Sequence, residues 1–153
     1  MKYLVRSLLV TLMLASGFAL SLNAQASKAH SQKKSIALHQ YCPVAYVAMG
    51  KAVKGNSKYA STYRGKTYYS SSADAKKMFD AEPAKYLPKY DGYCATALAM
   101  GQKMESDPEL FSVHEGATYL FSSKDAKQAF DKDPEATISM ADKQFAALEK
   151  KQH

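Results

Sequence analysis

The chain has 153 residues, a formal net charge of +7 and 46% hydrophobic residues, a length that fits one domain or two closely packed repeats. Its lysines are scattered among acidic residues, which indicates a solvated surface rather than a patch that binds nucleic acid. The sequence contains no P-loop and no G-x-G-x-x-G, G-x-S-x-G, H-E-x-x-H or C-x-x-C motif, which weakens an enzymatic interpretation and assigns no catalytic residue.

Residues 1–26 have the pattern of a secretory signal peptide. A positively charged start precedes an apolar run over residues 8–22, and the small residues Ala24 and Ala26 then form a cleavage pattern. The alternative is an uncleaved helix, because the uncharged window approaches membrane-spanning length. Cleavage is favoured, and it predicts a periplasmic or secreted protein without stable membrane insertion. Residues 27–35 are polar and are expected to form a flexible tether.

One segment of the chain occurs twice. Residues 65–79 are repeated fifty-one residues later at residues 116–130, and the alignment continues without a gap to Pro83 and Pro134. A fixed spacing of this kind indicates two copies of one supersecondary unit.

Each copy is predicted to form a pair of antiparallel strands followed by a helix. The strands flank Arg64-Gly65 in the first copy and Glu115-Gly116 in the second. A serine caps each helix, and a proline follows its end. The buried helix faces are expected to consist of Ala75, Met78 and Phe79 and of Ala126, Ala129 and Phe130.

The predicted fold class is α+β, with two repeated units of short antiparallel strands plus helices packed as one compact domain. The first copy is assigned to residues 36–90 and the second to residues 91–148, and residues 149–153 are expected to fray. Three further elements are predicted: an extended segment over residues 36–46, a short buried helix over residues 92–100, and a final helix from Pro134 with a buried stripe of Ile138, Ala141, Phe145 and Leu148.

These features resemble a known family. A glycine, an aromatic strand that ends in serines, a helix with a core phenylalanine, and then Pro83 and Tyr86 are similar to the small domain called YHS. The second copy matches the lettered positions loosely as His114, Tyr119 and Ser122. The wider layout resembles exported bacterial YHS-domain proteins over roughly residues 36–147.

The resemblance implies metal handling, because YHS domains are associated with copper-transporting pumps and related metal-handling proteins. The chain departs from the pattern of the related cysteine-rich metal-binding modules at three positions. The cysteines that such modules place at the end of the aromatic strand are Ser71 and Ser122 here, and the one expected soon after Pro43-Val44 is Ala45.

Cys42 and Cys94 occupy corresponding places in the two copies. Each follows a tyrosine and is trailed by Ala-Met-Gly. If the copies pack about a pseudo-twofold axis, the two sulfur atoms come close together. In an oxidising compartment they then form a disulfide. Alternatively, two thiolates hold a soft metal ion such as copper, helped by Met49, Met100, Met104 or His114.

Other interpretations of these residues stay open. The cysteines are simply buried free thiols in one alternative, and Met100 and Met104 at helical spacing are more typical of core residues. His114 and His39 are typical of exposed imidazoles beside turns, with metal binding as the alternative.

Taken together, these patterns predict an exported protein that binds a metal ion without catalysis. Copper is the favoured ion, and the expected role is metal handling in the cell envelope. Its expected partner is the metal ion or an envelope protein, and nucleic acid is not expected. One alternative is a structural or interaction module stapled by Cys42 and Cys94 without metal. Another is a thiol-dependent enzyme that uses Cys94.

The export hypothesis predicts a mature chain that starts at Ser27 and is found outside the cytoplasm, because the small residues Ala24 and Ala26 precede it. Intact-mass spectrometry of the protein purified from the cell envelope measures this directly. A mass that includes the first 26 residues would refute cleavage and favour the uncleaved anchor.

Overall fold

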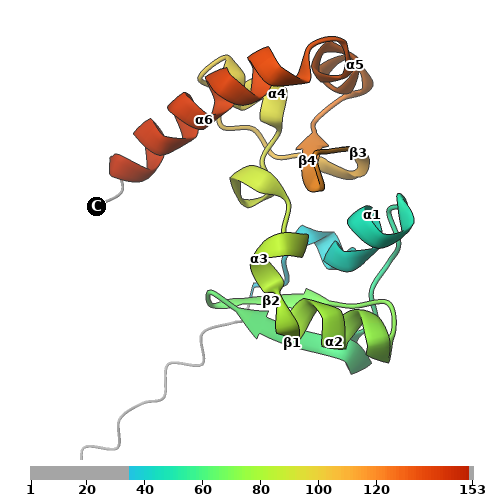
Figure 1. Cartoon of the computed structure of the whole chain (residues 1–153). Helices are drawn as coiled ribbons and strands as arrows, with labels where there is room; N and C mark the ends of the chain where they lie inside the picture. The colour runs from blue at the N-terminus through green and yellow to red at the C-terminus, as the bar shows by residue number, and fades with distance from the viewer. Residues whose placement is uncertain (1–34, 152–153) are drawn as a thin grey trace, which may run out of the picture. The chain divides into compact units, whose positions relative to one another are not determined.

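Within residues 35–151, the part of the chain that the computed structural model describes, helices alternate with two separate antiparallel strand pairs (Figure 1). The predicted α+β class and the compact domain with two strand-pair units are confirmed. The predicted signal peptide, nearly all of the tether and the last two residues lie outside the described residues. None of the described helices is long and apolar enough to cross a membrane.

We call residues 36–90 the N-terminal half and residues 91–148 the C-terminal half. Apart from η2, which has no counterpart among the described residues of the C-terminal half, their elements follow the same order. The N-terminal half comprises η1 (Leu38–Gln40), α1 (Pro43–Met49), η2 (Ser57–Tyr59), β1 (Ala60–Tyr63), β2 (Lys66–Tyr69), α2 (Ala73–Ala81) and α3 (Pro83–Tyr86). The C-terminal half, entered through η3 (Lys89–Gly92), comprises α4 (Ala95–Ala99), β3 (Asp107–His114), β4 (Ala117–Phe121), α5 (Lys124–Lys132) and α6 (Pro134–Lys150).

The predicted strand pairs are confirmed. Strand β1 pairs with β2, and β3 pairs with β4, both antiparallel. Their turns have the same backbone: Arg64 and Gly65 have φ of 46° and 75°, and Glu115 and Gly116 have φ of 49° and 75°. Two successive positive φ values are what a tight hairpin turn requires. The glycine in each turn therefore explains why the chain reverses there.

A left-handed turn that the sequence did not indicate precedes each cysteine. Three consecutive residues have positive φ in η1 and again in η3. For residues other than glycine this conformation costs roughly 1–2 kcal/mol each, so the surrounding packing must fix it. The turns are followed by Cys42 and Cys94, which are the N-cap residues of α1 and α4.

The extended segment predicted for residues 36–46 is wrong at Leu38–Gln40, whose positive φ values form η1, and again from Pro43 onward, where α1 begins. Proline excludes helix at the residue before it but is favoured in the first helical turn. Cys42 is accordingly extended, with φ −76° and ψ 116°, and the helix follows. The helix predicted for residues 92–100 is present but shorter, because η3 occupies its expected start.

The buried helix faces are narrower than predicted. Phe79 and Phe130 are each 1% exposed, as expected. Met78 and Ala129, at corresponding positions, are exposed, so their assignment to the core is wrong. Each helix packs on its strand pair through a narrow stripe of apolar side chains. The residue just before the phenylalanine points toward solvent. The apolar stripe of the final helix is confirmed by Ile138, Ala141, Phe145 and Leu148, which all pack in the core of the C-terminal half.

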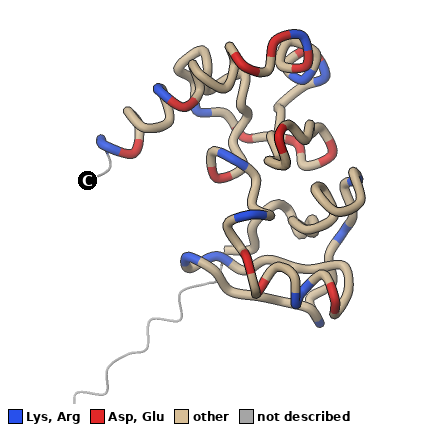
Figure 2. The backbone as a smooth tube through the Cα atoms, in the orientation of Figure 1, with Lys and Arg blue, Asp and Glu red and all other residues tan. Residues whose placement is uncertain are grey.

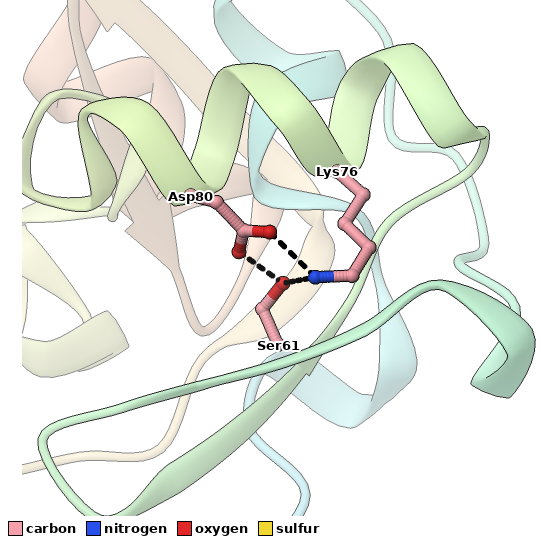
Figure 3. Close-up of polar contacts among 3 residues, drawn as sticks. All are labelled: Ser61, Lys76 and Asp80. Carbon is pink, nitrogen blue, oxygen red and sulfur yellow. Dashed lines mark hydrogen bonds and ion pairs between the residues drawn. The ribbon is translucent and has the colours of Figure 1, made fainter.

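A serine, a lysine and an aspartate tie the helix to the first strand in each half. In the N-terminal half, Ser61 donates a hydrogen bond to Asp80, and Lys76 contacts both (Figure 3). The hydrogen bonds from Lys76 and Ser61 hold the pKa of Asp80 below its usual value. The C-terminal half has the same two contacts at its aspartate: Asp131 accepts hydrogen bonds from Ser112 and from Lys127. Elsewhere along α2, α5 and α6, positive and negative residues are interspersed (Figure 2).

A small aromatic cluster joins the two halves. Tyr41, Tyr46 and Leu120 are buried together, and Phe111 packs against them. The Tyr46 hydroxyl donates a hydrogen bond to the carbonyl of Pro108 at 2.9 Å, and its ring meets that of Phe111 at a centroid distance of 4.9 Å. Helix α1 of the N-terminal half is thereby fixed to strand β3 of the C-terminal half.

The core packing predicts that Phe79→Ala and Phe130→Ala each lower the free energy of unfolding by about 3–5 kcal/mol. Phe130 contacts the rings of Tyr119 and Phe121, whereas Phe79 contacts that of Tyr68, so Phe130→Ala should cost more. Denaturant unfolding followed by circular dichroism measures both. A melting curve unchanged from that of the wild type would show that the ring does not stabilise the fold.

Candidate metal centre

A groove of about 560 Å³ lies in the C-terminal half between α4 and the start of α5. Its lining includes three sulfur-bearing side chains, those of Cys94, Met100 and Met104. Ser122 at the end of β4 and Asp125 in the first turn of α5 add oxygen atoms. The three sulfur-bearing side chains therefore line one concave place on the molecule.

Cys94 forms the closed inner side of this groove. It is 0% exposed and follows the left-handed turn, as the N-cap residue of α4. Its Sγ accepts a hydrogen bond from the Ser122 hydroxyl at 3.3 Å and another from the Ala97 N–H at 3.5 Å. Its own N–H donates to the carbonyl of Met104 at 3.0 Å. The sulfur is thus held in a fixed position by α4 and β4 together.

Met100 and Met104 lie at the open side of the groove. Met100 is 66% exposed and Met104 is 47% exposed, so their expected placement in the core is wrong. Gly101, with φ 76°, ends the helix at this point, and Met104 therefore lies outside it. Within residues 35–151 every methionine is exposed, which shows that none of them serves as core filling.

The donor types in the groove fit a soft metal ion. Thiolate and thioether sulfur suit monovalent copper better than hard divalent ions. A thiol beside two mobile thioethers can enclose such an ion, because methionine side chains adapt to irregular spaces. The groove residues that would hold it are Cys94, Met100 and Met104, with Ser122 next to the thiol.

Cys42 does not take part in this groove. Within residues 35–151 both cysteines are free and buried, and the predicted disulfide is not formed. Cys42 packs in the hydrophobic cluster of the N-terminal half, with Val44 and Phe79 among its members. Cys94 packs in the separate cluster of the C-terminal half. Each cysteine is buried by its own half, so corresponding positions in the two halves do not place the sulfurs together.

The other predicted ligands also lie elsewhere. Met49 is 56% exposed at the end of α1, and His39 is exposed in the first left-handed turn. His114 is at the end of β3, where its Nε2 is 2.8 Å from Oε1 of Glu135. Sequence reasoning did not identify Glu135, or the neighbouring Glu115, as partners of His114. The only sequence signal for Glu135 is its place directly after Pro134, at the start of the final helix.

Comparison with known proteins supports the resemblance for the N-terminal half. No curated protein and no solved structure matches the chain. Residues 44–90 match the family model described as the YHS domain. This range runs from α1 to Tyr90 in η3 and contains the first strand pair and its helices. Over residues 44–90 the chain is therefore similar to a YHS domain.

Proposed function

We propose that the protein binds one soft metal ion in the groove of the C-terminal half, with copper(I) as the favoured ion. We propose that it handles this ion without catalysis. The observation that carries this proposal is that one thiol residue and two thioether residues, Cys94, Met100 and Met104, line the same groove. Metal binding is consistent with the YHS family, and copper as the ion follows from the softness of these donors.

The contact between Ser122 and Cys94 supports the proposal. Related metal-binding modules have a cysteine at the strand end that Ser122 occupies here. The Cys94 sulfur lies 3.3 Å from the Ser122 hydroxyl oxygen. A thiol is thus present beside the position that carries one in those modules, although it comes from another segment of the chain.

We also propose that the C-terminal half is a second copy of the YHS-like unit. The family match covers only residues 44–90, but the second half repeats its hairpin turn, its capped helix and its aspartate contacts at a spacing of fifty-one residues. The left-handed turn before the cysteine is repeated as well. On this account the first copy retains the family sequence and the second carries the metal groove.

The alternatives are less well supported. A thiol-dependent enzyme needs a base that ionises the catalytic thiol, whereas among the described residues the Cys94 sulfur contacts the Ser122 hydroxyl and the Ala97 N–H. A module stapled by a disulfide requires a bond that the structure does not contain. An interaction module without metal is the alternative that the copper titration must exclude.

We propose further that the protein acts outside the cytoplasm, in the periplasm or after secretion. The signal-peptide pattern of residues 1–26 supports this location. A metal ion, or an envelope protein that exchanges the metal ion, is the proposed partner.

The groove predicts that the reduced protein binds one copper(I) ion per chain. Competition with a chromophoric copper(I) chelator measures the affinity. Met100→Leu/Met104→Leu should weaken binding by more than the roughly tenfold that loss of an outer-shell partner costs. These side chains are exposed, so the variant stays folded. Cys94→Ser should weaken binding further, because the only thiol of the groove is lost.

Cys42→Ser is the matched control, because Cys42 is equally buried but does not line the groove. It should bind copper(I) as the wild type does. Equal affinity in the wild type and the double methionine variant would contradict the groove. A loss in Cys42→Ser as large as that in Cys94→Ser would also contradict it. Circular dichroism of every variant verifies that the fold is intact.

A further inference from the structure

We propose that His114, Glu115 and Glu135 form a second site, which binds a divalent metal ion of the zinc type. One ligand atom from each residue lies within 4.8 Å of the other two. The closest pair is Nε2 of His114 and Oε1 of Glu135, at 2.8 Å. None of the three residues lines the sulfur groove, so this site does not depend on the proposed copper site.

Three separate elements bring these ligands together. His114 is the last residue of β3, Glu115 is in the turn that follows, and Glu135 is in the first turn of α6. The imidazole is 28% exposed, and its edge packs against the ring of Phe130, with the ring planes at 87°. This packing restricts the imidazole ring before an ion binds. Binding therefore has to order only the two exposed carboxylates.

The N-terminal half shows that the fold does not require these side chains. At the positions that correspond to His114, Glu115 and Glu135 it carries Tyr63, Arg64 and Ala84. The hairpin turn is the same in both halves, because Arg64 has φ of 46° and Glu115 has φ of 49°. The backbone therefore forms without a ligand group at any of the three positions. The convergence of an imidazole and two carboxylates is a property of the C-terminal half alone.

The chemistry of the three ligands selects the class of ion. Imidazole nitrogen and carboxylate oxygen suit zinc or divalent copper and do not suit monovalent copper. Two carboxylates also balance the charge of a divalent cation. Three protein ligands leave a coordination position for water or for an exchange partner, as in open zinc sites. The domain would then hold a soft ion in its groove and a harder one at this hairpin.

Isothermal titration of the full mature chain with zinc chloride tests the proposal. The titration uses the Cys94→Ser background, so that the thiol of the groove does not compete for zinc. One zinc ion per chain is expected. Glu135→Gln should weaken binding at least about tenfold, and it leaves the fold intact because the Glu135 side chain is 74% exposed. His114→Gln should weaken it further.

Two matched controls complete the experiment. Glu82→Gln removes an exposed glutamate elsewhere in the domain, and His39→Gln removes an exposed histidine, and neither should change the affinity. Zinc-induced shifts of the His114 ring signals in an NMR spectrum would support the site directly. Absence of zinc binding would overturn the proposal, and so would binding that Glu135→Gln and His114→Gln leave unchanged. Either result leaves the copper groove unaffected.

Discussion

The arrangement of the domain depends on how the short segment from Met104 to Pro108, which leads into β3, is held at its two ends. At one end, the N–H of Cys94 donates to the carbonyl of Met104 at 3.0 Å. At the other, the buried hydroxyl of Tyr46 donates to the carbonyl of Pro108 at 2.9 Å. Burial raises the pKa of Tyr46, so the hydroxyl keeps its proton. The N-terminal half thereby positions a segment that forms one side of the sulfur groove.

This constraint assigns different roles to two halves that share one framework. Cys42 and Tyr46 are fully buried, and they contribute to packing and to the contact between the halves. Cys94 is equally buried, yet its sulfur lies beside a groove and accepts hydrogen bonds from two donors. The same backbone therefore supports a structural cysteine in one half and a candidate ligand in the other. A shared order of elements therefore does not by itself give both halves the same site.

The sequence predicted the local structure of the two strand-pair units well, because the signals for turns and helix ends are local. The glycine turns, the serine caps at Ser72 and Ser123, and the proline at the start of the last helix all correspond to observed features. It did not predict the left-handed turns before the cysteines, because no glycine marks the first of them. It also did not predict that Cys42 and Cys94 lie in different environments, because spacing along the chain does not determine how the two halves pack. The sulfur groove could not be predicted from the sequence, because it depends on where α4 ends, and this end places Met100 in solvent.

X-ray absorption at the copper edge of the copper(I)-loaded protein tests the central claim most directly, because it identifies the atoms bound to the ion. The account predicts a first shell dominated by sulfur, from Cys94, Met100 and Met104. In Met100→Leu/Met104→Leu the sulfur contribution should fall while the thiolate of Cys94 remains. A shell of nitrogen and oxygen in the wild type, or a sulfur shell that this variant leaves unchanged, would contradict the proposed groove.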